Sequence, residues 1–296
     1  MKVKLSIIIP GLNLKEYLIP CLESIFKNRP NFPFEVIYVD NGSTDGSVEM
    51  IETTVTSGQW LVASEKKKKR PITLRLIKNS SNLGFTKANN QGARVAQGKY
   101  LLFLNSDTEI VDGALGKMVK FLEEHPKAGV VGPKLYNSKK MDLQLTSTGR
   151  LTPLTAIFAL SFINKYFPNN CFSRKYFLLG WDRNSIKEVE AVSGAALMIR
   201  ADLFKKIGGF DERYFSYFEE TDLCMAVKKE GKKAVYLPEA GIIHYGGKTT
   251  QKMPKMEKIF IQSRYRFMKK HYGFLAALIT ESVLRFFERL SKNEKK

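Results

Sequence analysis

Three carboxylates lie within four positions of an otherwise basic chain, at Glu219, Glu220 and Asp222. They are expected at the start of a helix that ends near Gly231, where the helix dipole favours a carboxylate by about 0.3–1 kcal/mol. Such a capping role explains one acidic side chain, but it does not readily explain three that are flanked by four aromatic residues. Like charges packed together raise the pKa of at least one group, which suits a general base.

A second polar group, Asn105, Ser106 and Asp107, follows directly after the apolar run Tyr100–Leu104. An apolar run without alternation is typical of a strand buried on both faces of a parallel sheet, and ligands bind at the carboxyl ends of such strands. The Asp107 carboxylate and the Asn105 amide could therefore present oxygen atoms to a hard divalent cation that carries a diphosphate. The same residues also suit a strand-to-helix turn, with Asp112 capping the next helix.

Two turns could bind other parts of a nucleotide. The stretch Asp40–Ser47 follows an expected strand, where Asp40 could accept a hydrogen bond from a pyrimidine ring and Gly42 would let the backbone approach closely. A glycine turn followed by an N-cap explains this stretch equally well. The stretch Asn82–Asn90 opens a helix whose N-terminus favours an anion, and asparagine is a poor helix former, which suggests a use for the Asn89 side chain.

Two later residues are also candidates. His244 follows the expected strand Ala234–Leu237 and is one of only three histidines in the chain. A single histidine is usually a satisfied core residue, but one beside a glycine pair is also a candidate ligand. Gly194 falls within a predicted strand, Val189–Ile199, where it would allow close backbone approach.

The first half of the sequence alternates predicted strands and helices, and this alternation must position these groups. Strands are expected at Leu5–Ile9, Phe34–Val39, Leu74–Ile77 and Tyr100–Leu104, and helices at Glu16–Asn28, from about Ser47, and at Thr86–Gln97. Repeated strand–helix units with short connections predict an α/β fold with a doubly wound, Rossmann-like and mostly parallel sheet.

The second half loses clear periodicity over residues 136–188. Within it, the apolar and aromatic segment Leu154–Phe167 is too short to span a bilayer. A buried helix is the preferred interpretation of this segment, and a membrane-dipping loop is the alternative.

Composition restricts the class of protein. The 296 residues have 44% hydrophobic content and a formal net charge of +19, which suggests an anionic partner. Cys21, Cys171 and Cys224 match no zinc or disulfide pattern, and no apolar run near the N-terminus is long enough for a signal peptide. We therefore expect a cytoplasmic protein. The run Lys66–Arg70 is interpreted as a solvated loop, with contact to lipid head groups as the alternative.

The last 46 residues form a predicted basic tail, with twelve Lys and Arg against four Glu, a net of +8. One helical stripe is apolar and the opposite one is charged, so the helix is amphipathic rather than transmembrane. The apolar stripe comprises Leu275, Leu278, Ile279, Ser282, Val283, Phe286 and Leu290. The stripe could lie on an anionic membrane surface or pack against the rest of the chain or a partner subunit, and the sequence favours neither.

Eight short motifs occur together in an order and spacing that resembles glycosyltransferase family 2, with its rhamnosyltransferase-like branch the nearest. The motifs are Ser6–Pro10, Val39–Ser47, Asn82–Phe85, Leu104–Asp107, Val192–Ala195, Gly209–Asp211, Glu219–Leu223 and His244. The resemblance implies a GT-A fold over about residues 1–250, with a donor-binding half at about 1–112 and an acceptor and catalytic half at about 113–250. The tail, 251–296, lies outside it.

The resemblance also implies roles for residues. Asp40 would bind the base, Asp107 the metal that bridges the diphosphate, and His244 the metal or diphosphate. Glu220 would be the general base, with Glu219 as the alternative and Asp222 beside them. Two departures are notable, because Asn105 replaces the first Asp of the usual Asp-x-Asp, and Glu220 replaces an Asp.

The other residues assigned to the site complete this set. The donor-binding residues are Pro10, Asn13, Asp40, Gly42, Ser43, Asn82, Gly84, Phe85, Asn89, Asn105 and Ser106, and the acceptor-binding residues are Gly194 and Trp181.

The resulting expectation is an inverting transferase that uses Mg²⁺ or Mn²⁺. It would move a sugar from dTDP-rhamnose or a UDP-hexose to a saccharide or lipid-linked saccharide in cell-surface polysaccharide synthesis. Peripheral contact with an anionic membrane and homo-oligomer formation stay open. A sugar-nucleotide pyrophosphorylase would need a glycine-rich, arginine-bearing loop that Pro10–Asn13 does not provide. A nucleic-acid-binding module is indicated only by charge, and a non-catalytic saccharide-binding protein is the remaining alternative.

Overall fold

A computed structural model describes residues 2–57, 73–137, 140–248 and 255–293 of the chain. The basic run Lys66–Arg70 lies outside the described residues, as do the first four residues of the predicted tail.

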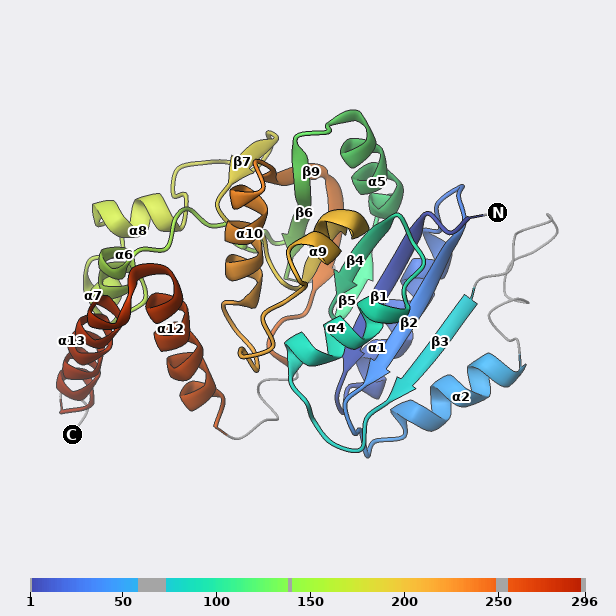
Figure 1. Cartoon of the computed structure of the whole chain (residues 1–296), viewed down its shortest axis with the longest axis horizontal. Helices are drawn as coiled ribbons and strands as arrows, with labels where there is room; N and C mark the ends of the chain where they lie inside the picture. The colour runs from blue at the N-terminus through green and yellow to red at the C-terminus, as the bar shows by residue number, and fades with distance from the viewer. Residues whose placement is uncertain (1, 58–72, 138–139, 249–254, 294–296) are drawn as a thin grey trace.

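Nine strands form one mixed sheet within the described ranges, in the order β3-β2-β1-β4-β8-β6-β9-β5, with β7 paired to β9 (Figure 1). The strands are β1 (Leu5–Gly11), β2 (Phe34–Asp40), β3 (Thr73–Lys78), β4 (Tyr100–Leu104), β5 (Thr108–Ile110), β6 (Ala128–Tyr136), β7 (Lys187–Val189), β8 (Ala196–Arg200) and β9 (Lys233–His244).

The first four strands, β3, β2, β1 and β4, are all parallel, as the strand–helix alternation predicts. The central strands β1, β2 and β4 are buried along their whole length. Their side chains alternate between two faces, so that Ile7 and Ile9 belong to one apolar core and Ile8 to the other. Unbroken apolar runs are required because helices cover both faces.

Helices α1 (Lys15–Lys27), α2 (Ser47–Ser57) and α5 (Ala114–Glu124) contribute to the core on one face of the sheet. Helices α4 (Phe85–Val95), α9 (Ala201–Lys206) and α10 (Glu219–Lys229) contribute to the core on the other face. This two-sided arrangement confirms the predicted α/β class.

The second half of the sheet departs from two predicted strands. The single strand expected over Val189–Ile199 is wrong, because β7 and β8 are separate strands that pair with different neighbours. The strand expected over Ala234–Leu237 is much longer: β9 continues past a register shift opposite Pro133 and Lys134 and ends at His244. As a result, the turn before β8 and the end of β9 lie at the same edge of the sheet as the carboxyl end of β4.

A third apolar cluster lies outside the sheet, where α6 (Pro153–Ala159) and α8 (Cys171–Tyr176) meet the C-terminal helices. Those helices, α12 (Met256–Tyr272) and α13 (Phe274–Asn293), are joined at Gly273, which has a φ of +87°. Figure 1 shows this helical group at one end of the long axis, away from β3 and α2.

The single buried helix predicted over Leu154–Phe167 is only partly confirmed, because Ala156 and Ala159 of α6 are buried in the third apolar cluster but the helix ends at Ala159. The segment forms α6 and the single turn α7 (Ile163–Tyr166), and its side chains Leu154, Tyr166 and Phe167 are exposed. The apolar residues of this segment are therefore divided between a core and the surface. In the part of the chain that the structure describes, every helix is too short or too polar to cross a bilayer.

Candidate active site

A cavity of about 470 Å³ lies where β1 and β4 reach their carboxyl ends. Ten of the residues predicted from the sequence line it: Pro10, Asn82, Phe85, Asn105, Ser106, Asp107, Gly194, Glu219, Glu220 and His244. They come from strand ends, from the turn before α4 and its first residue, from the turn before β8 and from the first turn of α10. The location agrees with the general rule that open α/β sheets bind ligands at this edge.

Asp107 and His244 form a pair in this cavity. Strand pairing sets their positions, since Thr108 of β5 is opposite His244 of β9 and the Tyr245 amide donates to the Asp107 carbonyl at 3.0 Å. The His244 Nε2 lies 3.5 Å from the Asp107 Oδ1 and 3.4 Å from the Asn105 Nδ2. Asp107 is buried and His244 is nearly so.

A neighbouring amide orients the His244 ring. The His244 Nδ1 lies 2.9 Å from the Gln144 Oε1, and an amide oxygen can only accept, so Nδ1 carries the proton. In the neutral ring, Nε2 then has a lone pair next to the Asp107 carboxylate. Hydrogen bonding of the second ring nitrogen is the usual way in which proteins fix a ligating histidine.

The donor set fits a divalent cation that is also bound by its substrate. Asp107 supplies one hard oxygen ligand and His244 one imidazole nitrogen. A mixed set of this kind suits Mn²⁺ better than it suits Mg²⁺, which prefers oxygen ligands alone. Among the described residues no group of three or more His, Cys, Asp or Glu side chains could hold a metal. Further ligands would therefore have to come from a bound diphosphate and water.

Glu219 and Glu220 reach the cavity from the first turn of α10. Burial, followed by the charge of Glu220, raises the pKa of Glu219 well above its ordinary value of 4.5. Burial also raises the pKa of Glu220, to about 6. The Glu219 Oε2 is buried without a hydrogen-bond partner, which favours the protonated acid. Burial and the missing partner therefore favour the protonated form of Glu219, while Glu220 can accept a proton as an ionised carboxylate near pH 7.

A strained turn presents these two carboxyl groups. Tyr217 and Phe218 precede α10 with φ values of 70° and 69°, a conformation that bulky residues rarely adopt. Such a turn persists only where its surroundings determine it, at a cost of about 1–3 kcal/mol per residue. The surroundings here are apolar: the Phe218 ring lies 5.2 Å from Phe260 and 5.8 Å from Phe267, both on α12.

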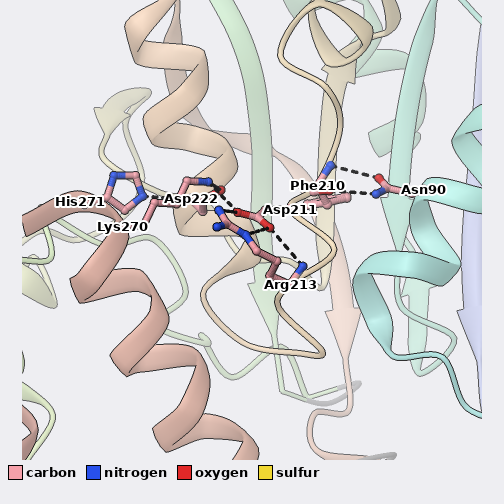
Figure 2. A network of polar contacts seen from close by, with 7 residues as sticks. All are labelled: Asn90, Phe210, Asp211, Arg213, Asp222, Lys270 and His271. Atoms are coloured by element: carbon pink, nitrogen blue, oxygen red, sulfur yellow. Dashed lines mark hydrogen bonds and ion pairs between the residues drawn. The ribbon is translucent and has the colours of Figure 1, made fainter. Parts of the chain in front are cut away.

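Hydrogen bonds from α4 hold the loop before α10 in place. The Asn90 side chain both donates to the Phe210 carbonyl and accepts from the Phe210 amide (Figure 2). The Phe85 amide donates to the Phe215 carbonyl at 2.7 Å. Gly84, with a φ of +90°, is required by the same contact, because a Cβ atom there would lie 2.7 Å from the Phe215 oxygen.

Helix α12 holds the same region from the other side (Figure 2). The Asp222 carboxylate lies 2.8 Å from the Lys270 Nζ and 2.7 Å from the His271 Nε2. Lys270 also pairs with Asp211, and the hydrogen bond from Arg213 holds the pKa of Asp211 well below its usual range. The first turn of α10 is thus fixed by charged contacts to a helix beyond the predicted GT-A region.

Several sequence-predicted site residues lie outside the cavity lining. Asp222 faces α12, as described above. The Asp40 Oδ2 accepts from the amides of Gly42 and Ser43 at 2.9 Å each, so this carboxylate holds its own turn. Asn13 accepts from the Thr44 amide and joins the same turn.

Two more predicted residues also have contacts elsewhere. Asn89 donates to the Phe85 carbonyl within α4. The Trp181 ring packs against Tyr236, 4.8 Å between centroids, and its Nε1 donates to Ser185.

The cavity also contains residues that the sequence reasoning missed. They include Gly11, Asn41, Ser193, Phe215, Ser216, Tyr217 and Met256. Asn41 and Ser193 stand next to Asp40 and Gly194, which were already singled out, so neighbouring polar positions were a usable signal. Met256 and Gln144, which orients His244, had no such signal, because each comes from a segment far in the sequence from the motifs.

Solved structures show the fold class. The chain superposes on Staphylococcus aureus TarS 1–349 in complex with UDP-GlcNAc with a TM-score of 0.59, at 19% identity, covering 96% of this chain and 71% of that one. For GalNAc-T7 with UDP, GalNAc and Mn²⁺ the TM-score is 0.60, at 16% identity, covering 82% of this chain but only 44% of the other. These proteins have the GT-A fold, so the predicted fold is confirmed.

The sequence match identifies the family. The model of the family described as Glycosyl transferase family 2 matches residues 6–207, more than half of the chain, and the protein belongs to this family. It is a glycosyltransferase, as predicted.

Two curated relatives cover most of the chain. An N-acetylglucosaminyl-diphospho-decaprenol L-rhamnosyltransferase of Mycobacterium tuberculosis is 25% identical over 257 residues, 83% of this chain and 76% of the relative. The O-antigen biosynthesis protein RfbC of Myxococcus xanthus is 26% identical over 244 residues, 82% of this chain and 17% of that longer protein.

Proposed function

We propose that this protein transfers a sugar from a nucleoside-diphosphate donor to a saccharide or lipid-linked saccharide, with a divalent cation and with inversion at the anomeric carbon. The observation that carries the proposal is that the Asp107–His244 pair and the ionisable Glu220 line one cavity at the carboxyl edge of the sheet. A cation ligand set and a general base are the two components that such a displacement needs.

The chemistry is a single displacement. The ionised Glu220 carboxylate accepts the proton of an acceptor hydroxyl, and the hydroxyl oxygen forms a bond to the anomeric carbon. The bond from that carbon to the diphosphate oxygen breaks, and the electron pair leaves with the nucleoside diphosphate. A cation held by Asp107 and His244 would stabilise the charge on this leaving group. Burial and the charge of Glu220 both favour the protonated form of Glu219, which limits the negative charge beside the base.

The donor and acceptor are proposed from the relatives. The Mycobacterium tuberculosis relative is named as a rhamnosyltransferase that acts on a diphospho-decaprenol-linked sugar, so dTDP-rhamnose is the first donor to test and a UDP-hexose the second. A lipid-linked acceptor of cell-surface polysaccharide synthesis would place the enzyme at the cytoplasmic face of a membrane, and either Mg²⁺ or Mn²⁺ could serve.

The test is release of nucleoside diphosphate by the purified protein. It would be incubated with dTDP-rhamnose, UDP-sugars and GDP-sugars, with Mg²⁺ or Mn²⁺, a lipid-linked N-acetylglucosamine analogue, and with or without chelator. Chelator-sensitive release that depends on the acceptor is expected for at least one donor. Failure of all donors to bind, measured by calorimetry in the presence of Mn²⁺, would contradict the proposal.

A further inference from the structure

Large apolar side chains are exposed mainly at one end of the molecule. Of the twelve that are exposed among the described residues, eight lie on α6, at the end of α7 and on α13. Those of the α6–α7 segment are Leu154, Tyr166 and Phe167. Figure 1 places this segment and α13 together at the end of the long axis opposite to β3. An exposed single leucine is ordinary, but a concentration of this kind marks an interaction surface.

Helix α13 has two distinct faces. Its buried face carries Ala277, Thr280, Glu281 and Leu284, which pack toward the protein. The exposed stripe is Phe274, Leu275, Leu278, Ile279 and Phe286, in which Leu275 is 70% and Ile279 60% exposed. The helix therefore does not need this apolar stripe for its attachment to the rest of the chain.

The exposed residues of the two segments form one continuous surface. The Tyr166 ring lies 5.6 Å from Phe162, and Phe162 lies 5.1 Å from Phe287 of α13. Phe287 in turn lies 5.7 Å from the exposed Phe286. This row of four rings connects the tip of α7 to the stripe on α13. We call the combined surface the apolar end face.

Among the described side chains of these two segments, the exposed charged ones are basic. Residues 151–180, which include α6, α7 and α8, contain no Asp or Glu but three exposed basic residues, Lys165, Arg174 and Lys175. On α13, Arg285 is exposed, while the acidic Glu281 is buried in an ion pair with Arg264. An apolar helix face with flanking Lys and Arg is the arrangement that binds the interface of an anionic bilayer.

We propose that the apolar end face docks on an anionic phospholipid surface, with Leu275, Leu278 and Ile279 entering the region between head groups and acyl chains. The charge favours a membrane over a second copy of the chain, because an isologous contact would bring the same basic residues together. The inference rests on the proposed function for its purpose, which is to bring the cavity to a lipid-linked acceptor. Its physical basis in exposure and charge is independent of turnover.

Vesicle co-flotation of the full chain tests this docking. The wild-type protein is expected to float with vesicles of phosphatidylglycerol and phosphatidylcholine, and much less with phosphatidylcholine alone. The variant L275S/L278S/I279S should lower the partition coefficient by at least roughly tenfold, since three apolar side chains no longer leave water. The variant K165E/R174E/K175E should weaken binding to the anionic vesicles only.

The matched control is V95S/I186S, which removes two exposed apolar side chains elsewhere and should bind as wild type does. Equal flotation of wild type and the triple serine variant would overturn the proposal. So would a dimer that the serine variant abolishes, found by analytical ultracentrifugation while no form binds vesicles. Transfer to a water-soluble acceptor analogue should survive in all these variants, so loss of docking and failure of the proposed reaction give different results.

Discussion

The Nε2 atom of His271 lies 2.7 Å from the Oδ1 atom of Asp222, and both side chains are almost fully buried. His271 belongs to the C-terminal helix α12, while Asp222 belongs to the same turn as Glu219 and Glu220. Both helices lie beyond the family match, which ends at residue 207, and the contact joins α12 to the turn that carries the carboxylates of the cavity. Asp222 is therefore interpreted as a positioning residue that acts through the first turn of α10.

The Lys270→Ala variant tests this positioning role. Without the Lys270 ammonium, Asp222 and Asp211 lose a shared partner, and the turn that carries Glu220 is held less firmly. We expect kcat to fall by about ten- to a hundredfold, the usual cost of misplacing a catalytic group, with little change in the KM for the donor. Steady-state kinetics of Lys270→Ala beside the neighbouring Lys269→Ala measure the effect. Equal kcat values for Lys270→Ala and Lys269→Ala would show that the contacts of Lys270 with Asp211 and Asp222 have no role in catalysis.

The two glutamates should differ in their response to a Gln substitution. Glu219→Gln keeps a polar side chain of nearly the same size and leaves the proposed base Glu220 in place, so activity near pH 7 should stay within a few-fold of wild type. In wild type, the acid limb of the kcat/KM profile should titrate near pH 6, because only ionised Glu220 accepts a proton. Rates measured from pH 5 to 8 test both statements, and a larger loss in Glu219→Gln than in Glu220→Gln would reverse the assignment.

The free energy of unfolding should also depend on pH, because the pKa values of these two glutamates are raised by folding. The pKa values of Glu219 and Glu220 are raised in the folded protein above the ordinary 4.5, so the folded state binds more protons than the unfolded chain above that pH. The free energy of unfolding should therefore fall as the pH rises above 4.5 and through the raised pKa values. Urea unfolding across the pH range should show a smaller fall in Glu219→Gln, and an unchanged slope would contradict the assigned burial of this acid.

The orientation of His244 can be tested through Gln144. Gln144→Leu removes the acceptor of the hydrogen bond from His244 Nδ1 while leaving Asp107 and His244 in place. We expect the Mn²⁺ concentration for half-maximal activity to rise by about 10- to 100-fold, the usual effect of losing such an orienting contact. Most of the kcat should return at saturating Mn²⁺. A metal titration identical to that of wild type would exclude this role for Gln144.

The attachment of α13 to α12 depends on a buried ion pair. The Arg264 Nε lies 2.7 Å from the Glu281 Oε1, with the two side chains 2% and 6% exposed. Glu281→Ala leaves a buried guanidinium without its partner and should destabilise the helix pair by about 3–5 kcal/mol. The double variant R264M/E281L should recover most of this loss in urea unfolding. A single variant as stable as wild type would contradict the burial of this pair.

The parallel half of the fold was predictable from the sequence because its signal is local. Tyr100–Leu104 is β4 with the expected bounds, since a strand buried on both faces must be apolar throughout. The strand at Val189–Ile199 was mispredicted because apolar composition does not reveal that β7 and β8 pair with different neighbours. Leu154–Phe167 was mispredicted in part because an apolar residue looks the same in the sequence whether it is buried or exposed.

The candidate site was predictable to a similar extent. Asp107, Glu220 and His244 stand at strand or helix ends that the motifs mark, and the structure brings them to one cavity. The partners that tune them come from distant segments: Gln144 reaches His244, and Lys270 reaches Asp222. Such contacts depend on tertiary packing, which periodicity within the chain does not encode.

The most direct measurement compares wild type with Glu220→Gln in an assay of sugar transfer to a lipid-linked acceptor, with donor affinity measured for both by calorimetry with Mn²⁺. Glu220 is placed in the cavity as the base and not as a donor ligand, so we predict unchanged donor affinity with a fall in kcat of about 10²- to 10⁴-fold. Near-normal transfer by Glu220→Gln would contradict the proposed mechanism at its centre.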